Sequence, residues 1–90
     1  MVKIYVIIVY DVSIERVTKI CQFLRKYLDW IQNSVFEGEL TESQLKEIET
    51  KIKSIINEES DCVQIYSFRT IEMVNKLTIG KPKSNQETVI

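Results

Sequence analysis

Histidine is absent from this sequence of 90 residues. Its absence removes the side chain that most often serves enzymes as a general base and as a zinc ligand. The two cysteines, Cys21 and Cys62, are too few for a disulfide framework and lack the spacing of metal ligands. Ser34 and Ser67 have no histidine or paired lysine to activate them as nucleophiles. Any catalysis is therefore expected to depend on carboxylates, hydroxyls or a hard metal ion.

Long apolar segments are also missing. The apolar stretch Ile4–Val9 is far too short to span a bilayer, and the N-terminus lacks the charged start and small-residue cleavage site of a signal peptide. Hydrophobic residues make up 44% and charged residues 28% of the chain, as in a soluble globular domain. We expect one cytoplasmic domain that does not contact a membrane.

The first half of the chain predicts a strand, a helix and a second strand. The segment Lys3–Tyr10 is β-branched and aromatic, as strands usually are. Apolar residues then recur at helical spacing over residues 14–28, after Ser13, which could cap the helix. The segment Gln32–Leu40 predicts another strand, in which Gly38 marks a bulge or a close backbone approach.

The second half predicts a helix followed by two strands. Thr41 and Gln44 form a capping box before an amphipathic helix, and strands are predicted at Cys62–Arg69 and Val74–Gly80. This order is typical of an α+β sandwich of the ferredoxin-like βαββαβ type with an extra C-terminal strand. The strand count stays open, because Gly38 could divide the second strand. We expect residues 1–80 to form the domain and residues 81–90 to form a tail with a short strand.

The predicted strands are apolar on both alternating faces. The third strand, for example, carries Val63 and Ile65 on one side and Tyr66 and Phe68 on the other. Two helices cover only one face of a small sheet, whereas strands that are apolar on both faces are usually buried on both. We therefore expect a homodimer in which two sheets face each other, with the short strand of the tail docked on the partner.

A carboxylate ends the first strand, in the segment VIIVYDV at residues 6–12. Asp11 could cap the following turn, which is a frequent role of aspartate. Alternatively it could hold Mg²⁺, a hard cation that prefers carboxylate oxygens, if two copies of Asp11 meet across a dimer axis. Such an ion would activate water and offset charge on a phosphodiester. Tyr10 is either a core aromatic or a residue that positions the substrate or Asp11.

Positive charge gathers after this strand, although the net charge of the chain is −1. The segment Ser13–Asp29 holds four basic and two acidic residues. Arg16 and Lys19 lie one helical turn apart, where they could grip phosphate, although basic residues on a helix face are more often simply solvated. Trp30 and Phe36 fit a packed core better than a base-stacking platform. The pattern permits a face that binds nucleic acid but does not require one.

Two segments together, VIIVYDV and WIQNSVFEGEL, carry a family resemblance. Over residues 1–79 the chain resembles the small CRISPR-associated endonuclease family, the smaller of the two near-universal proteins of spacer acquisition. The resemblance implies a ferredoxin-like homodimer that cleaves RNA or double-stranded DNA with Mg²⁺. It implies that Asp11 is the metal ligand of each subunit and that Tyr10 is the aromatic beside it in the catalytic site. It also implies contact with nucleic acid for Arg16, Lys19 and Phe36.

The same resemblance implies a second role of another class. Dimers of this family resemble central scaffolds that bind a larger integrase subunit and span the duplex that is inserted as a spacer. In that role the nuclease site need not act, and the residues of this chain fit either role. Trp30 stands where many members of the family carry arginine. A toxin-like messenger-RNA nuclease on the same fold is a third possibility.

Overall fold

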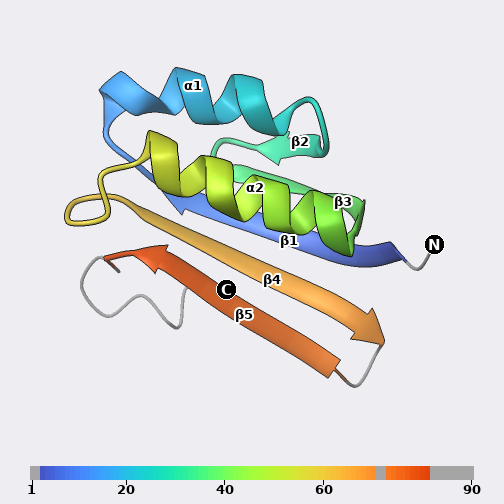
Figure 1. Cartoon of the computed structure of the whole chain (residues 1–90). Helices are drawn as coiled ribbons and strands as arrows, with labels where there is room; N and C mark the ends of the chain where they lie inside the picture. The colour runs from blue at the N-terminus through green and yellow to red at the C-terminus, as the bar shows by residue number, and fades with distance from the viewer. Residues whose placement is uncertain (1–2, 71–72, 82–90) are drawn as a thin grey trace.

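The computed structural model describes residues 3–70 and 73–81. Its elements are β1 (Lys3–Asp11), α1 (Ile14–Leu24), β2 (Asp29–Gln32), β3 (Val35–Thr41), α2 (Glu42–Ile55), β4 (Cys62–Thr70) and β5 (Met73–Gly80). The strands form one antiparallel sheet in the order β2-β3-β1-β4-β5. Both helices lie on one face of this sheet, and no element of the described residues covers the other face (Figure 1).

This architecture confirms the predicted fold. The first six elements form the ferredoxin-like βαββαβ unit, in which β3 lies between β1 and β2, and β5 extends the sheet beyond β4. The short strand predicted near the C-terminus lies outside the described residues. In the described part of the chain, no helix is both long enough and apolar enough to cross a membrane.

The core lies between the sheet and the helices. Alternate side chains of the central strand β1 point toward the helices, and the apolar stripes of α1 and α2 pack onto them. The most deeply buried members of this cluster in β1, α1 and α2 are Ile4, Val6, Ile8, Ile20, Leu24, Ile48 and Ile52. The predicted capping box starts α2, because the Gln44 N–H donates to Thr41 Oγ1 and the Thr41 N–H donates to Gln44 Oε1.

Helix α1 is shorter than predicted. It ends at Leu24 rather than at position 28, and a turn follows in which the Lys26 N–H donates to the Phe23 carbonyl and the Tyr27 N–H donates to the Leu24 carbonyl. Leu28 is nevertheless buried, with 6% of its surface exposed. The predicted helix end was wrong because apolar spacing reports burial, and Leu28 enters the core from the turn.

The predicted strand Gln32–Leu40 consists mainly of β3, and only its first residue belongs to β2, a separate strand that the sequence did not predict. The turn lies at Asn33 and Ser34, between β2 and β3, and not at Gly38. A Cβ on Gly38 would lie 3.0 Å from Leu28 Cδ2 and 3.7 Å from Leu28 Cα. The close approach at Gly38 is thus made by the side chain of Leu28, whereas the nearest backbone atom lies at an ordinary contact distance, and Gly38 does not break the strand.

A buried ion pair joins the start of α1 to the turn between α2 and β4. Asp61 is 0% exposed, and it is the one charged residue that is buried where side-chain burial is described, in residues 3–68 and 77–81. Its Oδ2 accepts from Arg16 Nε at 2.6 Å, and its Oδ1 accepts from Arg16 Nη2 at 3.2 Å. The backbone N–H groups of Ser13 and Asn57 donate to the same carboxylate, each at 3.0 Å. The desolvated charge is thus paired and hydrogen-bonded, as buried charges must be.

Ser13 is the N-cap residue of α1 by position, as predicted, but its side chain does not cap the helix. Its hydroxyl oxygen is buried and has no hydrogen-bond partner among the described residues. The carboxylate of Asp61 instead accepts from the Ser13 N–H. A negative charge at this position also interacts favourably with the positive end of the helix dipole.

The assignment of the core is tested by Ile8→Ala. This variant should lower the free energy of unfolding by about 3 kcal/mol, because isoleucine-to-alanine changes in a core typically cost about 2–5 kcal/mol. Ile14→Ala is the matched control, since it removes the same atoms from a side chain that is 89% exposed. The control should change stability by less than about 0.5 kcal/mol. Urea unfolding followed by circular dichroism measures both, and equal losses would contradict the assignment.

The ion pair is tested by Asp61→Asn as a function of pH. Hydrogen bonding from Arg16 lowers the pKa of the Asp61 carboxyl from 3.8 to about 2. The stabilisation is therefore fully present above a pH of about 4 and is lost as the pH falls toward about 2. Near neutral pH the variant should be less stable by about 2 kcal/mol, the scale of a charged hydrogen bond.

The same unfolding experiment, repeated at decreasing pH, gives the decisive comparison. The difference in stability between the wild type and Asp61→Asn should shrink as the pH falls from about 4 to about 2. A difference that stays constant over this range would show that the ionised carboxylate does not stabilise the fold.

Candidate functional site

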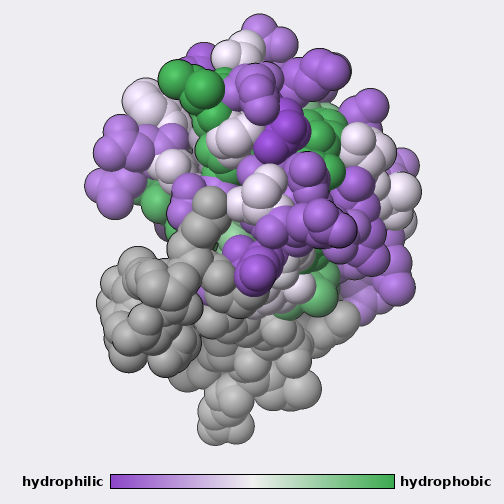
Figure 2. All heavy atoms as spheres, turned by 90° about the vertical axis from the view of Figure 1, so that its left-hand side faces the viewer, coloured by the Kyte–Doolittle hydropathy of each residue, from purple (hydrophilic) through white to green (hydrophobic). Residues whose placement is uncertain are grey.

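Asp11 lies at an accessible end of the sheet. At this end β1 ends, α1 begins, the turn between α2 and β4 passes, and β5 ends (Figure 1). Asp11 is exposed and lies opposite Cys62 of β4. Because strand residues alternate, its carboxylate shares the uncovered face with Ile7 and Val9. Hydrophilic residues cover most of the coloured surface when the molecule is viewed from this end (Figure 2).

The carboxylate of Asp11 does not act as a cap. Among the described residues it forms no hydrogen bond or ion pair, and the N–H of Ser13 is bound by Asp61 instead. Of the two roles that the sequence left open, the structure therefore gives no support to the turn cap. None of the described residues therefore occupies the two carboxylate oxygens of Asp11.

Asp11 offers a hard cation one carboxylate, without a cluster of further ligands around it in the described residues. The described residues contain no group of three or more histidine, cysteine, aspartate or glutamate side chains that could hold a metal ion. Mg²⁺ keeps several waters and commonly takes one or two carboxylates together with substrate phosphates. A single chain offers one exposed carboxylate at this position, and a second chain with the same face would bring the number to two.

Tyr10 lies on the other face of β1, inside the core. It is 4% exposed, and its hydroxyl donates to the Asn33 carbonyl at 3.3 Å. Burial, followed by the neighbouring Cys21, raises the pKa of this phenol. The Tyr10 N–H also donates to the Ser34 carbonyl at 3.0 Å. Tyr10 thus anchors the end of β1 to the turn between β2 and β3, while its hydroxyl points away from the face of Asp11.

Phe36 is a core residue. Its side chain is 0% exposed and stacks on Tyr10, with ring centroids 6.1 Å apart. A ring without exposed surface has no face to offer a base. Any influence of Phe36 on nucleic acid would pass through Tyr10 and the strand end that Tyr10 supports.

The two basic residues predicted to meet phosphate differ in their surroundings. Arg16 is bound to Asp61 through Nε and Nη2, and its Nη1 lies 3.8 Å from Glu15 Oε2. Lys19 is exposed and lines a groove between the helices together with Lys26 and Lys51. Three ammonium groups around one groove attract phosphate. The predicted phosphate contacts stay predictions, with Lys19 in the more accessible position.

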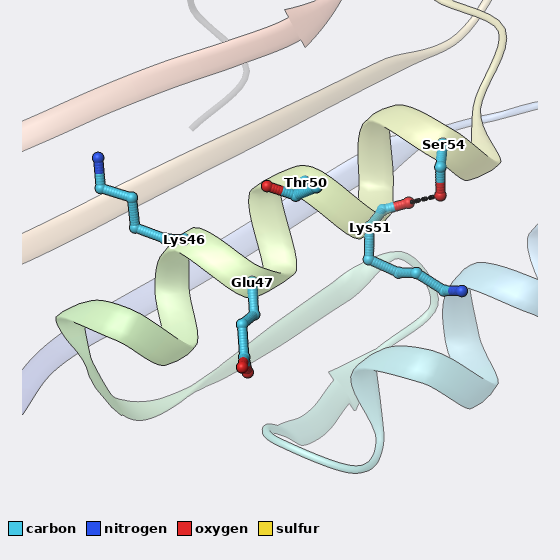
Figure 3. Close-up of a pocket in the computed structure, with 5 residues that line it drawn as sticks. All are labelled: Lys46, Glu47, Thr50, Lys51 and Ser54. Carbon is cyan, nitrogen blue, oxygen red and sulfur yellow. Dashed lines mark hydrogen bonds between the residues drawn. The ribbon is translucent and has the colours of Figure 1, made fainter.

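A second depression lies on the outer side of α2 alone. It is lined by Lys46, Glu47, Thr50, Lys51 and Ser54, and the Ser54 hydroxyl donates to the Lys51 carbonyl at 2.7 Å (Figure 3). It shares Lys51 and Ser54 with the groove between the helices, but Glu47 gives it mixed charge, whereas the charged side chains of that groove are all lysines. It is not part of the candidate site.

Trp30 is not a core residue, in contrast to the expectation from the sequence. It is 50% exposed on the edge strand β2, where its Nε1–H donates to the Asn33 carbonyl at 3.0 Å. The Arg25 guanidinium lies 5.5 Å from the centroid of its ring. Contacts of this cation–π kind are worth about 0.5–1 kcal/mol at exposed sites. An edge strand buries its side chains less than a central strand does, which explains the miss.

The uncovered face of the sheet is partly apolar. Val9 of β1 lies opposite Val35 of β3, and Tyr5 lies opposite Phe68 of β4 with ring centroids 6.4 Å apart. Tyr5 is 38% exposed, and the other three are partly buried. A face of this composition that is left uncovered commonly marks an interaction surface.

The chain is similar to proteins of one family over almost its whole length. The profile of the family described as "CRISPR associated protein Cas2" matches residues 4–75. The "CRISPR-associated endoribonuclease Cas2" of Methanothermobacter thermautotrophicus is 48% identical over 90 residues, covering 100% of this chain and 99% of that protein. The protein of the same name from Pyrococcus furiosus is 46% identical over 86 residues, covering 96% and 99% respectively.

Solved structures show the same relationship. A chain described as "Crystal structure of cas2" superposes with a TM-score of 0.73 at 45% identity, covering 98% of this chain and 99% of that one. A hypothetical protein, TT1823, from Thermus thermophilus superposes with a TM-score of 0.71 at 25% identity, covering 81% and 92%. The resemblance carried by VIIVYDV and WIQNSVFEGEL is confirmed, and the chain belongs to the CRISPR-associated protein Cas2 family.

Proposed function

We propose that this protein is a metal-dependent endonuclease of CRISPR spacer acquisition that works in the cytoplasm and hydrolyses phosphodiester bonds of RNA or double-stranded DNA. The relatives are named endoribonucleases, which supports the class of reaction. The observation that carries the proposal is the carboxylate of Asp11. It is exposed at the end of the central strand and has no partner among the described residues.

The catalytic unit of this proposal is a homodimer with opposed sheets. The partly apolar open face around Val9 and Val35 is the surface that a second copy would cover. Because Asp11 lies on this same face, two opposed copies can bring their Asp11 carboxylates together. A single chain offers one such carboxylate, and the dimer supplies the second.

Each side chain then has a distinct task. Bound Mg²⁺ would offset charge on the phosphodiester and make a bound water more acidic. Asp11 holds the ion through its carboxylate oxygens. Tyr10 keeps the end of β1 in place through its contact with the Asn33 carbonyl, and Phe36 supports Tyr10 from the core. Lys19 attracts phosphate from the helix layer.

A second candidate function is a non-catalytic dimeric scaffold that binds an integrase subunit and duplex DNA during spacer insertion. The small number of side chains suited to catalysis favours this function: the chain has no histidine, and Asp11 has no neighbouring cluster of ligands in the described residues. The groove lined by Lys19, Lys26 and Lys51 could hold a phosphate backbone without cutting it.

The enzymatic proposal is tested by Asp11→Ala. This variant should lose more than about 100-fold in Mg²⁺-dependent cleavage, because residues that merely support metal ligands already cost about 10- to 100-fold. Single-turnover cleavage of RNA and of double-stranded DNA, measured over a range of Mg²⁺ concentrations, gives the answer. The control Glu47→Gln removes another exposed carboxylate from the outer side of α2, away from the open face, and should retain activity.

Two outcomes of these assays would contradict the enzymatic proposal. Undiminished cleavage by Asp11→Ala would show that Asp11 is not the metal ligand. If the wild type cleaves neither substrate at any Mg²⁺ concentration, while Asp11→Ala still binds the integrase and supports spacer insertion, the scaffold is the correct function.

The proposed dimer is tested by Val9→Lys. A charge on the partly apolar face should weaken dimerisation by more than about 100-fold, because a buried charge without a partner is costly. Sedimentation equilibrium measures the dissociation constant. Thr50→Lys is the control, since it adds the same side chain to the exposed side of α2 (Figure 3). Unchanged association in Val9→Lys would place the interface elsewhere.

A further inference from the structure

The backbone around Asp11 is held from both sides by one neighbouring segment. Asp11 is paired with Cys62 in the ladder between β1 and β4. The residue before Cys62 is Asp61, whose Oδ1 accepts from the N–H of Ser13 at 3.0 Å. The chain before Asp11 is thus fixed by the sheet, and the chain after it is fixed by the carboxylate of Asp61.

Asp61 is itself held firmly. Its N–H donates to the Asn57 carbonyl at 2.7 Å, and its carbonyl accepts from the Lys81 N–H at 2.8 Å. Gly80 has a φ of 97°, and a Cβ at this position would collide with the Asp61 carbonyl. The side chain of Asp61 is gripped by the guanidinium of Arg16 through two hydrogen bonds. Because its backbone and its side chain are both fixed, Asp61 holds the backbone N–H of Ser13 at a defined position.

We propose that Asp61 and Arg16 form a positioning pair that sets the orientation of Asp11 toward its metal ion. This inference rests on the proposed role of Asp11 as a metal ligand. In this role Arg16 does not contact phosphate, because the Nε and Nη2 groups that could bind a phosphate donate to Asp61 instead. Neither member of the pair touches the substrate in this arrangement; both act through the backbone at Ser13.

A positioning role and a purely structural role of Asp61 and Arg16 differ in their effect on metal affinity. A contact that only stabilises the fold changes the fraction of folded protein, which is near one for the wild type and for mildly weakened variants well below their unfolding temperature. Metal affinity of the folded fraction then stays the same. A positioning pair instead changes the affinity of Asp11 for the cation in protein that is fully folded.

The experiment uses Mn²⁺ as a paramagnetic probe, since carboxylate sites accept it in place of Mg²⁺. Broadening of the backbone amide signals of Val12 and Ser13 is followed against Mn²⁺ concentration. Asp61→Asn and Arg16→Gln should each raise the concentration for half-maximal broadening by about 10-fold. Glu15→Gln, which removes an exposed carboxylate that also lies near Arg16, is the matched control and should stay within about twofold of the wild type.

A second measurement addresses Arg16 directly. Binding of duplex DNA is measured at several salt concentrations, because a lost phosphate contact lowers the slope of log affinity against log salt by about one. The proposal expects no change of slope in Arg16→Gln, and Lys19→Gln serves as the comparison for an exposed basic residue. A slope that drops by about one in Arg16→Gln, with unchanged Mn²⁺ broadening, would overturn the positioning role.

The outcomes distinguish this inference from the proposed function. If the wild type shows no broadening around Asp11, Asp11 is not a metal ligand, and the proposed positioning role of Asp61 and Arg16 is wrong as well. If the wild type is broadened and both Asp61→Asn and Arg16→Gln keep its Mn²⁺ dependence, the metal site stands and the positioning pair is wrong. If Asp61→Asn does not fold, Arg16→Gln still decides the question, because Arg16 is partly exposed.

Discussion

The carboxylate of Asp61 is fully buried, and three other segments of the chain bind this residue. Arg16 and the N–H of Ser13 donate to this carboxylate from the start of α1, and the N–H of Asn57 donates to it from the end of α2. After β5, the N–H of Lys81 donates to the backbone carbonyl of Asp61. Such a charge is costly to bury unless it is fully paired. The contacts of the Asp61 carboxylate therefore hold the end of the sheet that carries Asp11, whereas apolar packing holds the rest of the sheet.

The side chains that hold the backbone at this end of the sheet differ from the side chain that is exposed to a ligand. Asp61, Tyr10 and Phe36 are buried and act on the backbone at the strand end, while Asp11 is left exposed without a partner among the described residues. One carboxylate is a weak site for a divalent cation. The face that presents Asp11 is also the uncovered, partly apolar face of the sheet. In the proposed dimer the same surface provides both the association and the second ligand, so dimerisation and metal binding depend on each other.

The local patterns predicted the elements well, because strands and helices have different apolar periods. The bounds of the elements were predicted wrongly where a buried residue lies in a turn rather than in a helix or strand. Leu28 continues the apolar stripe of α1 but enters the core from a turn, and Gly38 provides room for Leu28 while the hairpin turns at Asn33. No local pattern marks Asp61, since its partner Arg16 is 45 residues away and only the fold brings them together. Asp11 was recognisable because it ends a strand within a family motif.

The central claim is that two chains meet through their open sheet faces and share a divalent ion between their Asp11 carboxylates. Diffraction from crystals grown with Mn²⁺, recorded at a wavelength where manganese scatters anomalously, tests it most directly. The account predicts one anomalous peak on the axis that relates the two chains, within bonding distance of an Asp11 oxygen from each. A dimer whose Asp11 side chains lie on separate surfaces, or manganese bound only at other residues, would contradict it.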